Sequence, residues 1–232
     1  MRFLNILLLF VVLNVFSQEK LPVVKQDSLF TAVDSLYRED QFYFGITINL
    51  LQKKPPGLVQ NGLSTSLNFG FLRDMPINKN RTWAIAAGLG LSYNKYHQNM
   101  KVTKTAGVVN YEIVDGASYS RNKMEQLFLD VPLEIRWRNS TFESHQFWRI
   151  YTGFKIRYLL YNKTKYVGDT DVTITNNADF NKLQYGPYLS FGYNTWNFYG
   201  FYGMNPIFKS AKIDGKAIDM RTLNLGLMFY IL

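Results

Sequence analysis

Several residue types and patterns are absent from this chain, and each absence removes a class of function. The 232 residues include no cysteine, which excludes disulfides, thiolate metal sites and cysteine catalysis. Beyond the N-terminal region, no apolar run reaches the roughly 20 residues that a membrane helix needs. The chain also lacks the Gly-x-Ser-x-Gly motif of serine hydrolases and the His-x-x-x-His spacing of many zinc sites. The common hydrolytic and metal-dependent mechanisms therefore have no sequence support.

Histidine is scarce, with only His97 and His145 in the chain. A lipid-modifying hydrolase needs a nucleophile and a base within reach, and the one candidate is His97 with a loop carboxylate such as Glu112 or Asp115. Nothing in the sequence around His97 supplies a matched base or a set of ligands. We therefore predict a non-enzymatic protein with no catalytic residues, no metal ligands and no cofactor.

What the chain does contain is alternation of apolar and polar residues with a period of two. From residue 223 to 231 the odd positions are large and apolar, and the even ones include Asn224 and Gly226. This period is typical of a β-strand whose two faces meet different surroundings. Bulky apolar and aromatic residues on one face, with Gly, Ser, Asn and charges on the other, indicate a barrel with lipid outside and a polar lumen.

Eight segments follow this pattern. They are residues 42–51, 62–73, 82–97, 124–138, 147–161, 182–195, 198–208 and 218–232. The sequence therefore predicts an all-β fold, an eight-stranded antiparallel transmembrane β-barrel over residues 42–232. The segment 198–208 is the least regular, because aromatic residues fill both of its faces. Within the long connection 98–122, residues 108–114 could extend a hairpin beyond the membrane.

Two further segments precede the predicted barrel. Residues 1–17 combine Arg2 with an apolar run and end in Val-Phe-Ser, as in an export signal peptide that is cleaved before Gln18. Residues 18–41 are polar and contain one short stretch of helical periodicity that Asp27 or Ser28 could cap. We expect them to form a periplasmic N-terminal helical arm or plug; the alternative is a loose tail.

Connection lengths and tryptophans indicate the orientation. Long connections alternate with short ones, and in outer-membrane barrels the short turns are periplasmic. With that topology all four tryptophans fall near the periplasmic edge, as in an aromatic girdle. The sequence thus predicts an outer-membrane location with both termini periplasmic. The last strand ends in a pattern that resembles the C-terminal signal read by the barrel-assembly machinery, formed by Asn224, Gly226, Phe229 and Ile231.

Charged residues are predicted to face the lumen on two adjacent strands. They are Asp130, Glu134, Arg136, Arg149, Lys155 and Arg157. Buried charges need partners, and cross-strand pairing of the acids on 124–138 with the bases on 147–161 supplies them. An eight-stranded barrel is just wide enough for side chains to fill it. We therefore expect a charge network in a closed lumen; the alternative is a selective pore or proton path.

The chain carries a net charge of +9, which raises the question of an anionic partner. It has no basic helix and no nucleic-acid motif, so we expect no nucleic acid. Outer-membrane lipid and lipopolysaccharide are the better partners. An alternative function is therefore a lipid-binding or adhesive barrel that acts through basic outer loops, with Lys53, Lys54, Lys101 and Lys104 as the contact residues.

Several segments resemble one known family. They are Phe42 to Asn49, Gln60 to Gly62, Asn68 to Asn78, Ala86 to Asn94 and Leu129 to Glu134. Together they resemble the PorT/SprT family of outer-membrane barrels of Bacteroidota, and the resemblance covers the whole predicted barrel. The Arg-Asp-Met-Pro-Ile-Asn turn is its most specific part.

The resemblance implies an accessory role in type IX secretion, the route that exports cargo bearing a C-terminal targeting domain. It also implies a link to gliding motility where the organism glides, and it brings no catalytic residues. A barrel too narrow for cargo must act through its surface, by docking to or stabilising a translocon or other envelope proteins. The candidate surfaces are the arm, the loops 98–122 and 162–181, and the inner turn. Within that turn the candidate contact residues are Arg73, Asp74, Met75, Pro76, Ile77 and Asn78.

Overall fold

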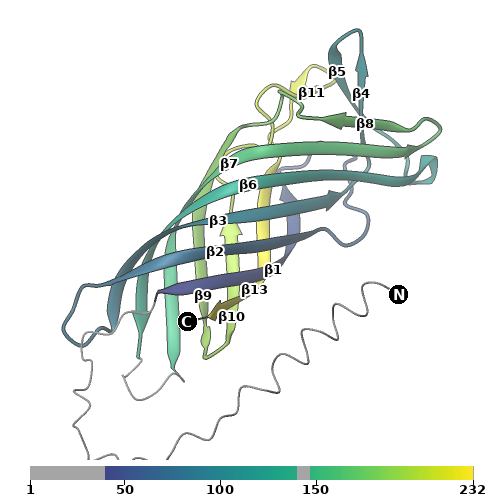
Figure 1. The fold of residues 1–232 in the computed structure, drawn as a ribbon. Helices are drawn as coiled ribbons and strands as arrows, with labels where there is room; N and C mark the ends of the chain where they lie inside the picture. Colours follow the sequence, from purple (N-terminus) through teal and green to yellow (C-terminus); the bar gives the residue numbers. More distant parts are fainter. Residues whose placement is uncertain (1–39, 140–146, 232) are drawn as a thin grey trace, which may run out of the picture. The chain divides into compact units, whose positions relative to one another are not determined.

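Eight long strands close into an antiparallel barrel in residues 40–139 and 147–231, the parts of the chain that the computed structural model describes (Figure 1). The barrel strands are β1 (Gln41–Gln52), β2 (Thr65–Pro76), β3 (Trp83–His97), β6 (Tyr119–Arg138), β7 (Trp148–Gly168), β9 (Leu183–Tyr193), β10 (Trp196–Tyr202) and β13 (Arg221–Ile231). Each pairs with the strands before and after it, and β13 returns to β1. The predicted fold class is confirmed.

The remaining elements lie in the long connections, which gather at one end of the barrel. They are the hairpin β4 (Met100–Thr105) and β5 (Val108–Ile113), the 3-10 turn η1 (Gly116–Ser118), β8 (Val172–Thr175), β11 (Lys212–Ile213) and β12 (Lys216–Ala217). We call this end the loop end. The other, where β1 begins and β13 ends, we call the terminal end. None of the helical segments that the structure describes is long and apolar enough to cross a membrane.

Alternation along each strand separates two faces. In β1 the even-numbered residues from Phe42 to Leu50 are exposed and the odd-numbered ones are buried. The same alternation recurs on β2, β3, β7 and β9. Most of the exposed set are Leu, Ile, Phe, Tyr and Trp side chains. Because this set would face water in a soluble protein, the outward surface is that of a barrel in lipid.

Tryptophans mark the terminal end, as the sequence predicts. Trp83 stands opposite Trp137, and the ring of Trp148 packs 5.4 Å from that of Tyr193. Trp196, at the start of β10, lies 5.4 Å from Phe229. Aromatic residues with one apolar and one polar side suit the boundary between lipid and water. This end of the barrel therefore carries an aromatic belt.

Several predicted strand boundaries differ from those of the structure. The strand predicted at 198–208 is β10, Trp196–Tyr202. It begins right after a tight turn in which Asn194 takes a positive φ of 52°. It ends early because Ile207 and Phe208 turn inward and become buried. In addition, β6 and β7 extend to Tyr119 and Gly168, beyond the predicted membrane segments. Of residues 108–114, which could extend a hairpin beyond the membrane, Val108–Ile113 form β5, which pairs with β4 in a hairpin at the loop end.

Some predictions fall outside the described residues. These are the signal peptide at 1–17, the helical part of the 18–41 arm, and His145. Only Asp40 and Gln41 of the predicted arm are described. Gln41 is the first residue of β1, and the Asp40 carboxylate accepts a hydrogen bond from the Asp74 amide at 2.8 Å.

Candidate functional site

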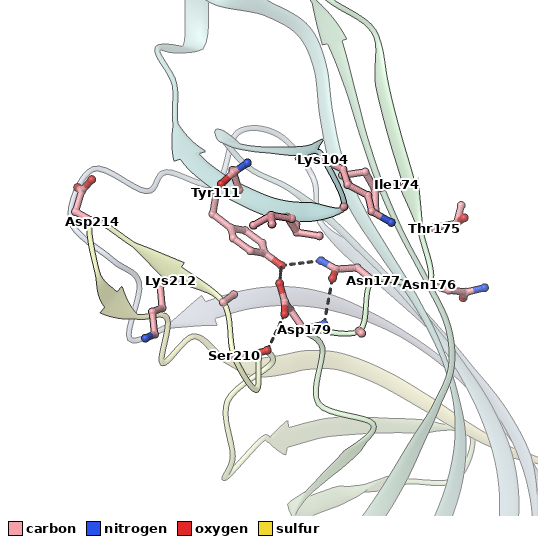
Figure 2. A pocket seen from close by; sticks show the side chains of 16 residues that line it. Lys104, Tyr111, Ile174, Thr175, Asn176, Asn177, Asp179, Ser210, Lys212 and Asp214 are labelled. Carbon is pink, nitrogen blue, oxygen red and sulfur yellow. Dashed lines mark hydrogen bonds between the residues drawn. The ribbon is translucent and has the colours of Figure 1, made fainter.

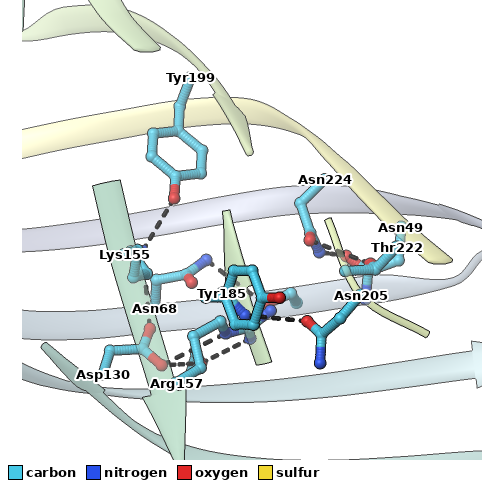
Figure 3. Close-up of polar contacts among 12 residues, drawn as sticks. Asn49, Asn68, Asp130, Lys155, Arg157, Tyr185, Tyr199, Asn205, Thr222 and Asn224 are labelled. Atoms are coloured by element: carbon cyan, nitrogen blue, oxygen red, sulfur yellow. Dashed lines mark hydrogen bonds and ion pairs between the residues drawn. The ribbon is translucent and has the colours of Figure 1, made fainter. Parts of the chain in front are cut away.

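The centre of the lumen holds a charge cluster around Asp130. Asp130 on β6 lies directly opposite Arg157 on β7, and Arg157 Nε is 3.3 Å from Asp130 Oδ1. Lys155 Nζ is 3.5 Å from Asp130 Oδ2 and donates to the Tyr199 hydroxyl at 2.8 Å (Figure 3). The structure thus brings together three of the six predicted lumen charges, on the two strands that the sequence indicated.

A second cluster lies nearer the terminal end and includes two residues outside the predicted network. Arg136 Nε donates to Glu134 at 2.7 Å, and its Nη1 donates to Asp74 at 3.0 Å. Arg138 makes two hydrogen bonds to the same Asp74 carboxylate. Glu134 also accepts from the Tyr188 hydroxyl at 2.8 Å. Asp74 therefore belongs to the lumen.

Arg149, the remaining predicted member, is apart from every described carboxylate. Its Nε and Nη1 find no acceptor among the described residues, although the side chain is buried. Its guanidinium lies over aromatic rings instead, 4.5 Å from the Phe147 centroid and 5.5 Å from that of Tyr230. Cation–π contacts of this kind stabilise a desolvated guanidinium. The predicted network is thus two ion clusters and one arginine among rings.

Aromatic side chains fill the lumen between the charges. The buried inner cluster is Tyr43, Leu72, Ala86, Tyr151, Tyr188, Tyr199, Phe201, Met228 and Tyr230. Glycines make the room that Tyr43 occupies: a Cβ on Gly90 would lie 2.0 Å from the Tyr43 hydroxyl, and one on Gly70 would lie 2.5 Å from it. Toward the loop end, Asn224, Thr222 and Asn49 form a hydrogen-bonded polar layer (Figure 3). The lumen is therefore packed rather than open.

The long connections form a cap with a hydrophobic core of its own at the loop end. This core collects buried residues from all four connections and from the strand ends. They include Leu51, Leu58, Tyr96, Met100, Val102, Met124, Phe128, Ile174, Phe180, Ile207, Phe208 and Met220. Phe180 and Phe208 pack with ring centroids 4.6 Å apart. The cap therefore covers the loop end of the packed lumen with apolar side chains.

The cap also holds a polar hollow of about 710 Å³ (Figure 2). The Tyr111 hydroxyl lies at its centre, where it donates to Asp179 at 2.9 Å and accepts from Asn177 at 2.6 Å. Ser210 completes the cluster by donating to Asp179 at 2.6 Å. Burial, together with the Asp179 carboxylate, raises the pKa of the Tyr111 phenol above its usual value. The phenol therefore stays protonated and acts as a fixed donor and acceptor between three loops.

The segment 73–78 is split between two faces, which corrects part of its predicted role. Asp74 is 1% exposed and bound in the lumen, so it is not available to a partner. Met75 and Ile77 face outward with 44% and 61% exposure, and Arg73 pairs with Asp40 at 2.9 Å. Asn78 closes the turn by accepting from the Trp83 amide. The predicted strand ends at residue 73, although the inward phase of Asn68, Gly70 and Leu72 continues to Asp74.

The four residues of the predicted assembly signal divide in the same way. Asn224 and Gly226 face inward, and a Cβ on Gly226 would lie 2.1 Å from the Ile46 carbonyl oxygen. Phe229 packs against Trp196 on the outer surface, where Ile231 is 59% exposed. Both halves of the pattern thus have structural roles in this barrel: close strand packing inside and a lipid-facing edge outside.

The basic loop residues and His97 occupy different surroundings. Lys53 is 3.2 Å from Asp219, and Lys101 is 3.0 Å from Asp169. Two of the four lysines proposed to contact an anion are therefore paired within the chain. His97 ends β3 on the outward face, opposite Lys123. In the described part of the chain, no cluster of three His, Cys, Asp or Glu residues could hold a metal ion.

A closed barrel with an apolar outer wall, an aromatic belt and a packed lumen defines the class of transmembrane β-barrels. Residues 16–209 match the family described as "Outer membrane protein beta-barrel domain". The chain belongs to this family, and it is an outer-membrane barrel. No curated protein matches the chain.

The chain has low similarity to several solved structures. The attachment invasion locus protein Ail of Yersinia pestis is 12% identical, with a TM-score of 0.38 over 83% of this chain and 99% of that one. Ail in complex with the heparin analogue sucrose octasulfate gives 12% identity and a TM-score of 0.34, over 82% and 97% of the two chains. A structure described as "Asymmetric conductivity of engineered proteins" gives 9% and 0.21, over 84% and 100%. Identities and TM-scores this low support no inference about function.

Proposed function

We propose that the protein is a non-enzymatic outer-membrane barrel that assists protein export by the type IX secretion system. It would dock to, or stabilise, a larger translocon, and it would support gliding motility where the organism glides. The observation that carries this proposal is the filled lumen, sealed by ion clusters and tyrosines and covered by the cap. A barrel without a conduit acts through its surfaces. Strands β1, β2 and β3 resemble the PorT/SprT family, and this resemblance supports the choice of secretion system.

We further propose that the terminal end faces the periplasm. Its connections, 77–82, 139–147 and 194–195, have at most nine residues, whereas the loop end carries 53–64, 98–118, 169–182 and 203–220. Short inner turns and long outer loops are the rule in this class of protein. In this orientation the residues before β1 form a periplasmic arm after removal of the 1–17 signal. The assembly machinery would read Asn224, Gly226, Phe229 and Ile231 as the last strand enters the membrane.

The outward residues of the 73–78 turn are the docking site that we propose at the periplasmic rim. Met75 and Ile77 present apolar side chains beside the exposed Arg73. Apolar groups next to an arginine are typical of energetically important contacts in interfaces. A translocon subunit on the periplasmic side of the outer membrane can reach them without entering the barrel.

Gene deletion and complementation test this function. Deletion should leave cargo with C-terminal targeting domains in the periplasm, and wild-type protein should restore its secretion. Ile77→Asp should restore less secretion and recover fewer envelope proteins in a pull-down. The matched control is Val59→Asp, because Val59 is also an exposed apolar residue, 51%, and lies in the 53–64 connection outside the candidate docking surfaces. Secretion that is unchanged by deletion would refute the proposal.

The polar hollow of the cap favours a second candidate, a lipid-binding or adhesive barrel that acts through its outer loops. Lys104 and Lys212 line the hollow together with Tyr111 and Asn177. Such a mixture of lysine, amide and phenol groups can bind an acidic sugar through hydrogen bonds and charge. Lys104→Glu with Lys212→Glu should then abolish binding of the purified protein to acidic polysaccharides while secretion is retained.

A further inference from the structure

A cluster of basic side chains lies on the outward surface of the barrel, just beyond the apolar band at the loop end. Tyr93, Leu127 and Tyr161 stand opposite one another on β3, β6 and β7, and they form the last apolar row. Beyond this row every second residue keeps the outward direction. The basic residues in this phase, here called the basic belt, are Lys95, His97, Arg121, Lys123, Lys163 and Lys165.

The strand register places these charges side by side. Lys123 stands between His97 and Lys165, and Glu125 stands between Lys95 and Lys163. Like charges that face each other across strands are destabilising. Glu125 accepts a hydrogen bond from Lys123.

The other four cations, Lys95, Arg121, Lys163 and Lys165, form no ion pair within the described chain. The belt therefore has an excess of positive charge that this part of the protein does not neutralise.

The belt borders a hollow of about 400 Å³ with a defined wall. Asn61, from the β1–β2 loop, donates from its backbone to the His97 carbonyl at 3.2 Å and from its side chain to the Tyr119 hydroxyl at 2.7 Å. These bonds fix the loop and the start of β6 on opposite sides of His97. A headgroup in the hollow would meet Lys95, Arg121 and Lys123 at once.

We propose that the basic belt binds the phosphorylated headgroup of an outer-leaflet glycolipid of the lipopolysaccharide type. Lysine and arginine are the residues that bind phosphate oxygens most strongly. The belt continues the lipid-facing wall, so the acyl chains of the same molecule can lie along Leu91 and Leu129, both exposed directly below it. A soluble anion has no acyl chains and would gain nothing from a site next to the lipid-facing wall. The inference rests on the proposed orientation, with the loop end outward, and not on a role in secretion.

The pKa of the His97 imidazole depends on the charge at this site. Burial, followed by the nearby Lys95 and Lys123, lowers the pKa of its imidazole. His97 lies beyond the apolar band, so its protonation follows the solution. A bound phosphate would offset the two lysines and favour the imidazolium. The titration midpoint of His97 should therefore rise when the belt is occupied.

The test uses the full barrel in phosphatidylcholine nanodiscs to which lipopolysaccharide is added in increasing fraction, with the His97 resonance as the readout. The variant is Lys95→Gln, Arg121→Gln and Lys165→Gln combined. The control is Lys79→Gln, Lys209→Gln and Lys216→Gln, which removes the same charge from exposed lysines away from the belt. At a contribution of about a fivefold factor per surface cation, the belt variant should need about a hundredfold more lipopolysaccharide for the same shift.

Folding of each protein is checked by its heat-modifiable migration on gels. Without lipopolysaccharide, Lys165→Gln alone should unfold at a slightly higher temperature than wild type, because it removes the like-charge pair of Lys165 with Lys123. Dephosphorylated lipopolysaccharide should leave the His97 midpoint unchanged. Equal lipopolysaccharide binding by wild type and belt variant would overturn the proposal. So would an equal shift with inorganic phosphate, which would mark a general anion site. Secretion by the Ile77→Asp strain is independent of both results.

Discussion

Arg138 on β6 forms a two-point ion pair with Asp74 on β2, in which Nη1 and Nη2 donate to Oδ1 and Oδ2 at 2.9 and 2.8 Å. Both side chains are fully buried, and their strands are separated by β3 in the sheet. The pair therefore spans the inner face of β3 and joins two strands that do not pair with each other. Because planar guanidinium and carboxylate groups match in geometry, this pair fixes the distance between the two strands.

Replacement of Asp74 should weaken the barrel strongly. Asp74→Asn leaves Arg138 and Arg136 buried without their shared carboxylate, and removal of one partner of a buried pair costs about 3–5 kcal/mol. The temperature of the heat-modifiable gel transition should fall accordingly. Arg73→Gln is the neighbouring control, because Arg73 is half exposed and its bond to Asp40 is a surface ion pair worth about 0–1 kcal/mol. Equal effects of the two changes would contradict the lumen assignment of Asp74.

The Tyr43 ring requires glycine at position 90, and this requirement can be tested by a double substitution. Gly90→Ala places a methyl group against the Tyr43 hydroxyl, and such overpacking costs about 1–3 kcal/mol. Tyr43→Phe removes the atom in closest contact and should restore part of the loss in unfolding by urea. Gly116→Ala is the control, since its nearest neighbour would be at an ordinary 3.7 Å. If Tyr43→Phe does not relieve the loss of stability, the added methyl group instead clashes with the backbone of the neighbouring strand.

The strands were predictable because each of them separates lipid from lumen, so apolar outward residues alternate with inward residues of other kinds. This signal holds even for β13, the last strand of the barrel, where Leu225 is exposed and Asn224 buried. It failed for Asp74 only because Met75-Pro76 reads as the start of a turn, whereas the structure keeps both residues in β2. The Asp130 cluster was visible for the same reason as the strands, since its members share the inward phase of neighbouring segments.

The cap could not be derived from the sequence. Its core joins Leu58, Met100, Phe180 and Ile207 from four separate connections, and no pattern within one connection indicates which residues of another it meets. Their contacts depend on how the barrel brings the loops together. The basic belt was hidden for a related reason: the outward phase of β7 changes at the bulge opposite Leu127 and Phe128, and only the observed register aligns Lys165 with Lys123.

The aromatic contact between Phe208 and Phe180 should hold the cap closed. Phe208 also packs 5.5 Å from Tyr111, and Phe→Ala changes in such cores cost about 3–5 kcal/mol. Phe208→Ala should expose the 203–220 connection and accelerate tryptic cleavage at Lys209 and Lys212. The barrel below has a separate core, so its heat-modifiable migration should be kept. Val108→Ala, at an exposed hairpin tip, should change neither; faster cleavage there would mean that the cap is loose throughout.

Protonation of His97 should make the barrel less stable toward acid, because the folded-state pKa of this imidazole is lowered. The unfolded chain, with a histidine pKa of about 6.5, then binds the proton more readily than the folded one. Stability is therefore complete above about pH 6.5 and falls as the pH drops from there through the lowered folded value.

In lipopolysaccharide-free detergent, NMR should place the His97 midpoint below that of an unfolded histidine. Lys95→Gln should raise the midpoint, since it removes one of the two lysines that oppose the imidazolium, whereas the distant Lys79→Gln should not. His97→Gln should abolish the loss of stability between these pH values. A midpoint that ignores Lys95 would show that burial alone sets the pKa, and that the charges of the belt do not act on its histidine.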